Sequence, residues 1–71
     1  MLGKTKIFVI SVKGMKCNNC RAFVEKAVLS VKGVRSVKIE EDSKTVCVTA
    51  KASVSLETIK SAVIAAGYEI E

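Results

Sequence analysis

The 71-residue sequence predicts an α+β fold in which a four-stranded antiparallel sheet carries two helices on one face, in the order β-α-β-β-α-β. Three observations support this prediction. Apolar residues alternate in three segments, recur at helical spacing in two others, and short polar or glycine-containing turns separate the segments. Since the chain also lacks proline and any Gly/Ser linker, residues 1–71 are expected to form a single domain.

Three segments show the alternation of strands that bury one face. They are Lys6–Val12, Val34–Glu40 and Thr45–Ala50, and the polar turn EEDSK joins the last two as a hairpin. The residues expected to face the helices are Phe8, Ile10, Val12, Val37, Ile39, Val46, Val48 and Ala50. The opposite face should be open to water, and Cys47 and Thr49 should lie on it.

The first helix is expected from Cys20 to Val31, with Asn18 or Asn19 as its N-cap and Gly33 just beyond its end. Its apolar residues are spaced by three and four positions, as one face of a helix requires. The residues expected on this face are Phe23, Val24, Ala27, Val28 and Val31.

The second helix is expected to follow Ser55, whose hydroxyl would cap it, and to stop at Gly67. Its apolar stripe consists of Leu56, Ile59, Ala62, Val63 and Ala66. The C-terminal segment YEIE is then expected to form a short fourth strand, which completes the ferredoxin-like, or split βαβ, sandwich.

Composition narrows the range of functions. The net charge of +5 favours an acidic partner, but the basic residues are spread along the chain and form no nucleic-acid-binding arm. The predicted open face has no aromatic residue on which bases could stack, so nucleic-acid binding is not expected. The longest apolar run, IFVISV, is too short to span a bilayer, so neither membrane insertion nor a targeting segment is predicted and the default location is cytoplasmic.

The segment VKGMKCNNCRAF contains two of the three cysteines of the chain. Cys17 is placed in the loop and Cys20 in the first helical turn, close to free backbone N–H groups and to the positive end of the helix dipole. The neighbouring cations Lys13, Lys16 and Arg21 should also stabilise thiolates and steer an acidic partner to the loop. Thiolates bind metals and attack disulfides, so both chemistries remain open at this point.

The number of available ligands separates these alternatives. A closed zinc site needs four Cys or His ligands, whereas this chain has no histidine and its third cysteine, Cys47, belongs to another part of the sheet. Two thiolates suit a soft ion such as Cu(I) or Hg(II), and an incomplete, exposed site favours transfer over storage. A thiol–disulfide oxidoreductase would use Cys17 as nucleophile and Cys20 as resolving thiol, but the absence of proline and tryptophan counts against it.

The sequence GMKCNNC, placed between a strand and a helix, resembles the Gly-Met-x-Cys-x-x-Cys motif of heavy-metal-associated (HMA) domains. VKGV and AAGYEI also resemble that family's helix-to-strand junction and its bacterial C-terminal ending, so the resemblance covers essentially the whole chain. It implies the same fold and a metal site formed by Cys17 and Cys20. It also implies that Met15 packs beneath the loop, that Gly14 allows the loop to turn, and that Tyr68 lies near the site.

The resemblance further implies a function in metal transfer without catalysis. Acidic residues often stand within or beside the motif in zinc- and cadmium-pumping relatives, whereas Lys16, Asn18 and Asn19 stand there in this chain. Cu(I) is therefore preferred, with Hg(II) as the alternative and Zn(II) behind both. The expected protein is a copper chaperone that is monomeric without metal and delivers Cu(I) to an acidic domain of a P-type ATPase. When metal is bound, a metal-bridged dimer is the alternative to a monomer. The alternative to a free chaperone is an excised domain of such an ATPase or of a mercury-resistance protein.

Overall fold

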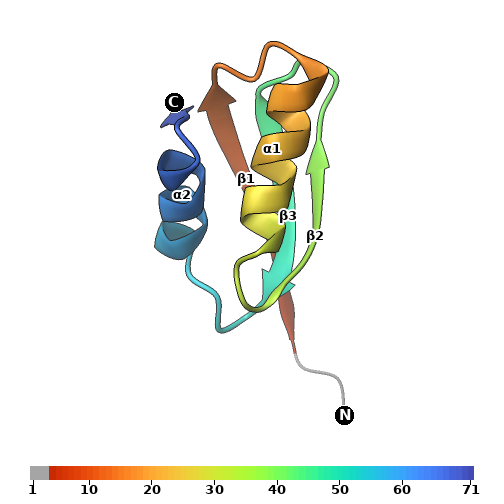
Figure 1. The fold of residues 1–71 in the computed structure, drawn as a ribbon. Helices are drawn as coiled ribbons and strands as arrows, with labels where there is room; N and C mark the ends of the chain where they lie inside the picture. The colour runs from red at the N-terminus through yellow and green to blue at the C-terminus, as the bar shows by residue number, and fades with distance from the viewer. Residues whose placement is uncertain (1–3) are drawn as a thin grey trace.

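The computed structural model of the protein describes residues 4–71 and has the expected order of elements. These are β1 (Thr5–Lys13), α1 (Asn18–Leu29), β2 (Val34–Ile39), β3 (Thr45–Lys51), α2 (Leu56–Ala65) and β4 (Glu69–Ile70). All neighbouring strands pair antiparallel, in the order β2-β3-β1-β4, and both helices cover the same face of the sheet (Figure 1). The predicted ferredoxin-like fold is confirmed.

The arrangement of the strands brings two connections and the last strand to one end of the molecule. The loop between β1 and α1, the turn between β2 and β3, and the short strand β4 all lie at this end, while β1 begins at the opposite end (Figure 1). The amide of Val12, at the end of β1, donates to the carbonyl oxygen of Lys44 in the β2–β3 turn at 2.8 Å. The candidate metal-binding loop therefore lies beside the hairpin turn.

The core fills the space between the sheet and the two helices. The strand residues and the α2 stripe that were expected to face it are buried or half-buried, as predicted. The side chains that form the buried core are Ile10, Val12, Met15, Val24, Val28, Val46, Val48, Ala50, Val54, Ile59 and Val63. Burial of a valine, isoleucine or methionine side chain stabilises the fold by roughly 1.5–3 kcal/mol. None of the helices within residues 4–71 is long and apolar enough to cross a membrane.

The start of α1 differs from the sequence prediction. The N-cap is Cys17 rather than Asn18 or Asn19, and its sulfur accepts a hydrogen bond from the Cys20 amide at 3.2 Å. The helix consequently begins at Asn18, two residues earlier than expected. The Asn18 side chain faces along the helix and accepts from the Arg21 guanidinium instead of capping the backbone. A thiol has thus taken the capping position that Ser, Thr, Asp or Asn usually occupies.

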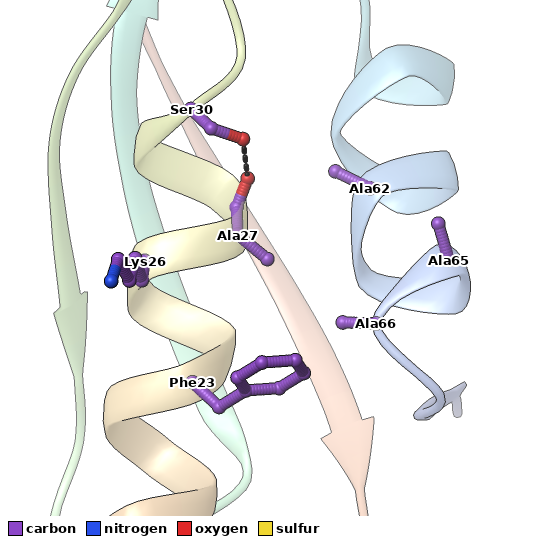
Figure 2. A pocket seen from close by; sticks show the side chains of 7 residues that line it. All are labelled: Phe23, Lys26, Ala27, Ser30, Ala62, Ala65 and Ala66. Carbon is purple, nitrogen blue, oxygen red and sulfur yellow. Dashed lines mark hydrogen bonds between the residues drawn. The ribbon is translucent and has the colours of Figure 1, made fainter.

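The end of α1 and one residue of its predicted apolar face also differ. The helix ends at Leu29, with Ser30 as its C-cap, so Val31 lies in the following turn, half-buried against the core. Gly33 then leads into β2 with a φ of +97°, a conformation that glycine adopts without steric cost. Phe23 is 54% exposed because it is turned away from the sheet, toward the side of α1 that faces α2 (Figure 2). Phe23 thus belongs to the predicted apolar face of the helix but is not part of the buried core.

Candidate metal centre

The loop between β1 and α1 turns tightly around a buried methionine. Gly14 has a φ of +96°, and its carbonyl oxygen accepts from the Lys16 amide at 2.9 Å, so the chain reverses direction around Met15. The Met15 side chain is 1% exposed and is part of the core. The flexible thioether side chain suits such an irregular space. Its packing anchors the loop to the core and leaves Cys17 exposed at the end of the loop.

The two cysteines of the motif lie at the start of α1. Both are free thiols; Cys17 is exposed and Cys20 is half-buried. A hydrogen bond with the Cys17 side chain, followed by one with the Tyr68 side chain, lowers the pKa of the Cys20 thiol. The helix begins here as well, because the Arg21 amide donates to the Cys17 carbonyl oxygen at 3.1 Å. The pair therefore combines an accessible sulfur with one whose thiolate form is stabilised.

Tyr68, in the connection between α2 and β4, lies beside the cysteine loop. A Cβ atom built on Gly14 would be 3.4 Å from the Tyr68 ring, so the ring packs directly over this glycine. The hydrogen bond with Cys20, followed by burial, raises the pKa of the Tyr68 phenol. On its other side, the Tyr68 ring lies 6.5 Å from the Phe23 ring, measured between centroids. Tyr68 therefore contacts the Gly14 turn, the Cys20 side chain and the Phe23 ring.

The three cations near the motif differ in their surroundings. Lys13 and Lys16 are exposed on the loop, as a surface for an acidic partner requires. Arg21 is half-buried, and its guanidinium donates to the Ser43 hydroxyl at 2.6 Å and to the Asn18 side-chain oxygen. Two of its nitrogen atoms therefore donate hydrogen bonds within the chain. Sequence reasoning missed Ser43, because no local pattern connects the β2–β3 turn to a helix residue 22 positions away.

The third cysteine lies on the opposite, open face of the sheet. Cys47 is half-buried, and its thiol donates to a carboxylate oxygen of Glu40 at 3.5 Å. Burial, followed by this contact with Glu40, raises the pKa of the Cys47 thiol. Within residues 4–71, no group of three or more His, Cys, Asp or Glu side chains could hold a metal ion. In the described part of the chain, the Cys17–Cys20 pair thus has no third candidate ligand beside it.

A groove between α1 and α2 is chemically different from the cysteine site. It has a volume of about 380 Å³ and is lined by Phe23, Lys26, Ala27, Ser30, Ala62, Ala65 and Ala66. Figure 2 shows the Phe23 ring and the side chains of Ala62 and Ala66 facing the space between the helices. The Ser30 hydroxyl donates to the Ala27 carbonyl oxygen at 2.6 Å. This lining offers no thiol or carboxylate, so the groove has no ligands for a soft metal ion.

The ferredoxin-like fold and the Cys-x-x-Cys pair at a helix start, with Cys17 exposed, together define a small domain of the soft-metal-binding class. Both sulfurs are on one continuous segment, so the site needs no long-range assembly of ligands. The chain belongs to the heavy-metal-associated domain family, whose model matches residues 9–69. The family membership predicted from the motif is confirmed.

Two curated relatives match nearly the whole chain. The copper chaperone CopZ of Enterococcus hirae is 40% identical over 62 residues, which cover 86% of this chain and 90% of that protein. The COP-associated protein of Helicobacter felis is 39% identical over 61 residues, which cover 86% of this chain and 92% of that protein. Both of these relatives are small proteins of about this length.

Two solved structures share the fold closely. Oxidised MerP from Ralstonia metallidurans superimposes with a TM-score of 0.86 at 32% identity and covers 96% of both chains. The Cu(I)-loaded N-terminal domain of a potential copper-translocating P-type ATPase from Bacillus subtilis gives a TM-score of 0.86 at 26% identity. That match covers 96% of this chain and 86% of the other. The fold is thus shared both with MerP and with a domain of a potential copper-translocating ATPase.

Proposed function

We propose that the protein is a Cu(I) chaperone that holds the ion between Cys17 and Cys20 and delivers it to a domain of a partner P-type ATPase. The observation that carries this proposal is the two-thiol site, exposed at the end of a loop and without a third ligand among residues 4–71. Soft sulfur ligands favour Cu(I) strongly. The similarity to copper chaperones and to a copper-ATPase domain supports the same choice of metal and partner.

Transfer proceeds by exchange of ligands. A thiolate of the acceptor binds the ion while both protein thiolates still hold it, and one protein sulfur then leaves. The ion remains Cu(I) throughout, so no electron is transferred and no oxidant is required. The exposed Cys17 is the sulfur that an acceptor reaches first, whereas Cys20 is half-buried beside Tyr68. The exchange passes through a shared intermediate, so copper is never released into solution.

The residues around the pair have supporting roles in this proposal. Gly14 and Met15 fix the loop to the core, and Tyr68 limits access of water to Cys20. Lys13 and Lys16 face the acidic partner. Residues 1–71 act as one heavy-metal-associated domain in the cytoplasm, without catalytic activity, and the chain is monomeric until metal or a partner binds.

Hg(II) is the second candidate for the metal, because two thiolates also suit this ion and a part of the mercuric reductase of Acidithiobacillus ferrooxidans is 33% identical to this chain over 61 residues. Competition among Cu(I), Hg(II) and Zn(II) under reducing conditions distinguishes them when stoichiometry and oligomeric state are read together. Preferential binding of Hg(II) would reassign the protein to mercury handling, and preferential binding of Zn(II) would refute the choice of a soft metal. We expect one Cu(I) per chain to persist in the presence of Zn(II).

The experiment that tests the chaperone proposal uses cysteine variants and a Cu(I)-chelating indicator. Cys17→Ser and Cys20→Ser should each abolish tight binding, because one thiolate cannot hold Cu(I) against the indicator. Cys47→Ser is the matched control and should bind as the wild type does, because that sulfur lies on the other face of the sheet. Stoichiometric binding by the Cys17→Ser, Cys20→Ser double variant would falsify the proposed site.

A further inference from the structure

We propose that Arg21 is a positioning residue, which fixes the cysteine-bearing segment to the β2–β3 turn and thereby strengthens Cu(I) binding. This inference rests on the proposed function of the Cys17–Cys20 pair. The contacts that carry it are those of the guanidinium with the Ser43 hydroxyl and with the Asn18 side-chain oxygen. We call this set of three side chains the Arg21 bridge.

The Arg21 bridge joins two separate segments through one rigid group. A guanidinium is planar and presents several N–H donors in fixed directions. One nitrogen, Nη1, donates to Ser43 Oγ at 2.6 Å, while the other, Nη2, donates to Asn18 Oδ1. Asn18 stands between the two cysteines, and Arg21 directly follows the second. The bridge therefore acts on the segment that carries both sulfurs.

The turn that receives the bridge is itself well ordered by hydrogen bonds. Asp42 accepts from the amides of Lys44 and Thr45, both at 2.9 Å, and from the Thr45 hydroxyl at 2.7 Å. The Ser43 amide donates to the Glu40 carbonyl oxygen at 3.1 Å. These bonds hold Ser43 at a φ of +59°, in the left-handed region that non-glycine residues rarely adopt. The Ser43 hydroxyl is consequently a fixed acceptor.

The same turn also holds the other side of the cysteine loop. The Val12 amide, at the end of β1, donates to the carbonyl oxygen of Lys44 at 2.8 Å. The strand that enters the loop and the helix that leaves it are thus both tied to the β2–β3 turn, one by backbone and one by Arg21. Because both ends are fixed, less conformational entropy is lost when the two sulfurs bind a metal ion. This is the physical basis of the stronger binding.

The test compares Cu(I) dissociation constants of variants that remove the bridge in different ways. Arg21→Lys keeps the charge but loses the planar fork, and Ser43→Ala removes only the distant acceptor. Each should raise the dissociation constant about 10-fold, which is the lower end of the effect of residues that orient metal ligands. The double variant Arg21→Lys, Ser43→Ala should bind Cu(I) no more weakly than the weaker of the two single variants, because both changes break the same interaction.

Lys44→Ala is the matched control, because it removes a cation from the same turn and leaves the Arg21 bridge intact. It should change the dissociation constant less than about 2-fold, since the bridge is the source of the stronger binding. If Arg21→Lys and Ser43→Ala bind Cu(I) as tightly as the wild type, the proposal is overturned. The proposal also fails if Lys44→Ala weakens binding as much as they do, because the charge alone would then explain the effect.

Amide hydrogen exchange of the metal-free protein separates this inference from the proposed function. Exchange at residues 17–21 should be faster in Arg21→Lys and Ser43→Ala than in the wild type or Lys44→Ala, because the segment is released. If the wild type fails to bind Cu(I), the proposed function fails and the exchange rates alone decide the role of the bridge. Unchanged exchange in both variants would then refute it.

Discussion

The three cysteines have different chemical surroundings, although all are free thiols. The pKa of Cys20 is lowered by hydrogen bonds with the Cys17 and Tyr68 side chains, whereas burial and the Glu40 carboxylate raise the pKa of Cys47. The first environment favours the thiolate and the second favours the thiol. The pKa of a cysteine thiol in this chain therefore depends on where the fold places the side chain.

This contrast predicts a difference in alkylation. Thiolates are the reactive species, so at neutral pH iodoacetamide should modify Cys20 faster than Cys47 in the metal-free, reduced protein. Mass spectrometry of peptides after short exposures measures the two rates. Unfolding in urea is the control and should bring the rates together, because both environments are then lost. Faster modification of Cys47 in the folded protein would contradict the prediction.

At the scale of elements, the sequence predicted the strands and the second helix well because these elements depend on periodicity. The inward residues of β1, β3 and α2 repeat at two- or three- and four-residue intervals, and the buried core follows those intervals. Local propensity was a poorer guide at the start of α1. Two asparagines follow Cys17, yet the Cys17 thiol caps the helix. The Asn18 side-chain oxygen instead accepts a hydrogen bond from Arg21.

The candidate site also has features that a local sequence pattern predicts and features that it does not. The positions of Cys17 in the loop and Cys20 in the first helical turn could be predicted, because both lie in one short segment with a specific spacing. The engagement of Arg21 could not be predicted, because it depends on Ser43 in a turn 22 residues away whose backbone has a left-handed φ. Likewise, the exposure of Phe23 depends on how far α2 lies from α1, which a helical repeat does not specify.

The two glycines that end the helical segments offer a matched comparison. Gly33 and Gly67 have nearly equal φ values of +97° and +99°, so alanine would strain the backbone at both by about 1–2 kcal/mol. A Cβ at Gly33 would also lie 2.6 Å from Cγ2 of the buried Val54, whereas one at Gly67 would meet nothing within 4 Å. Gly33→Ala should therefore lower the free energy of unfolding by about 1–3 kcal/mol more than Gly67→Ala. Urea denaturation measures both, and equal losses would show that β2 shifts to accommodate the new methyl group.

The β2–β3 turn should make stability depend on acid. Backbone and side-chain hydrogen bonds from Thr45, and the Lys44 amide, lower the pKa of Asp42 from 3.8 to about 2 in the folded protein. The unfolded chain therefore binds a proton first as pH falls, so this stabilisation is complete above about pH 4 and is lost between about pH 4 and pH 2. Asp42→Asn should be less stable than the wild type at neutral pH, with the difference shrinking over that range. Replacement of the exposed neighbour Glu41 by Gln is the control, and a difference that stays constant from neutral pH down to about pH 2 would contradict the assignment.

At the scale of the whole molecule, the candidate site lies at one end of the sheet, away from the opposite end. The cysteine loop, Tyr68 and the β2–β3 turn lie at one end, and Lys51 ends β3 at the other, opposite the start of β1 (Figure 1). The chain as a whole carries a net charge of +5. Long-range attraction to an acidic partner depends on this total, whereas docking of the loop depends on the cations that adjoin it. The two contributions can therefore be separated by placing the same charge change at different ends.

Association with the proposed acidic ATPase domain should accordingly slow as salt is raised from about 50 to 500 mM, because the charges are screened beyond a few ångströms. Lys13→Glu and Lys16→Glu should each reduce the association rate and its salt dependence more than Lys51→Glu, although all three lower the net charge equally. Stopped-flow measurement of Cu(I) transfer gives the rates, and Cu(I) affinity of each variant controls for effects on the site. Equal effects at Lys51 and Lys16 would mean that only the total charge steers the partner. An increase in rate with salt would show instead that the acceptor surface is basic.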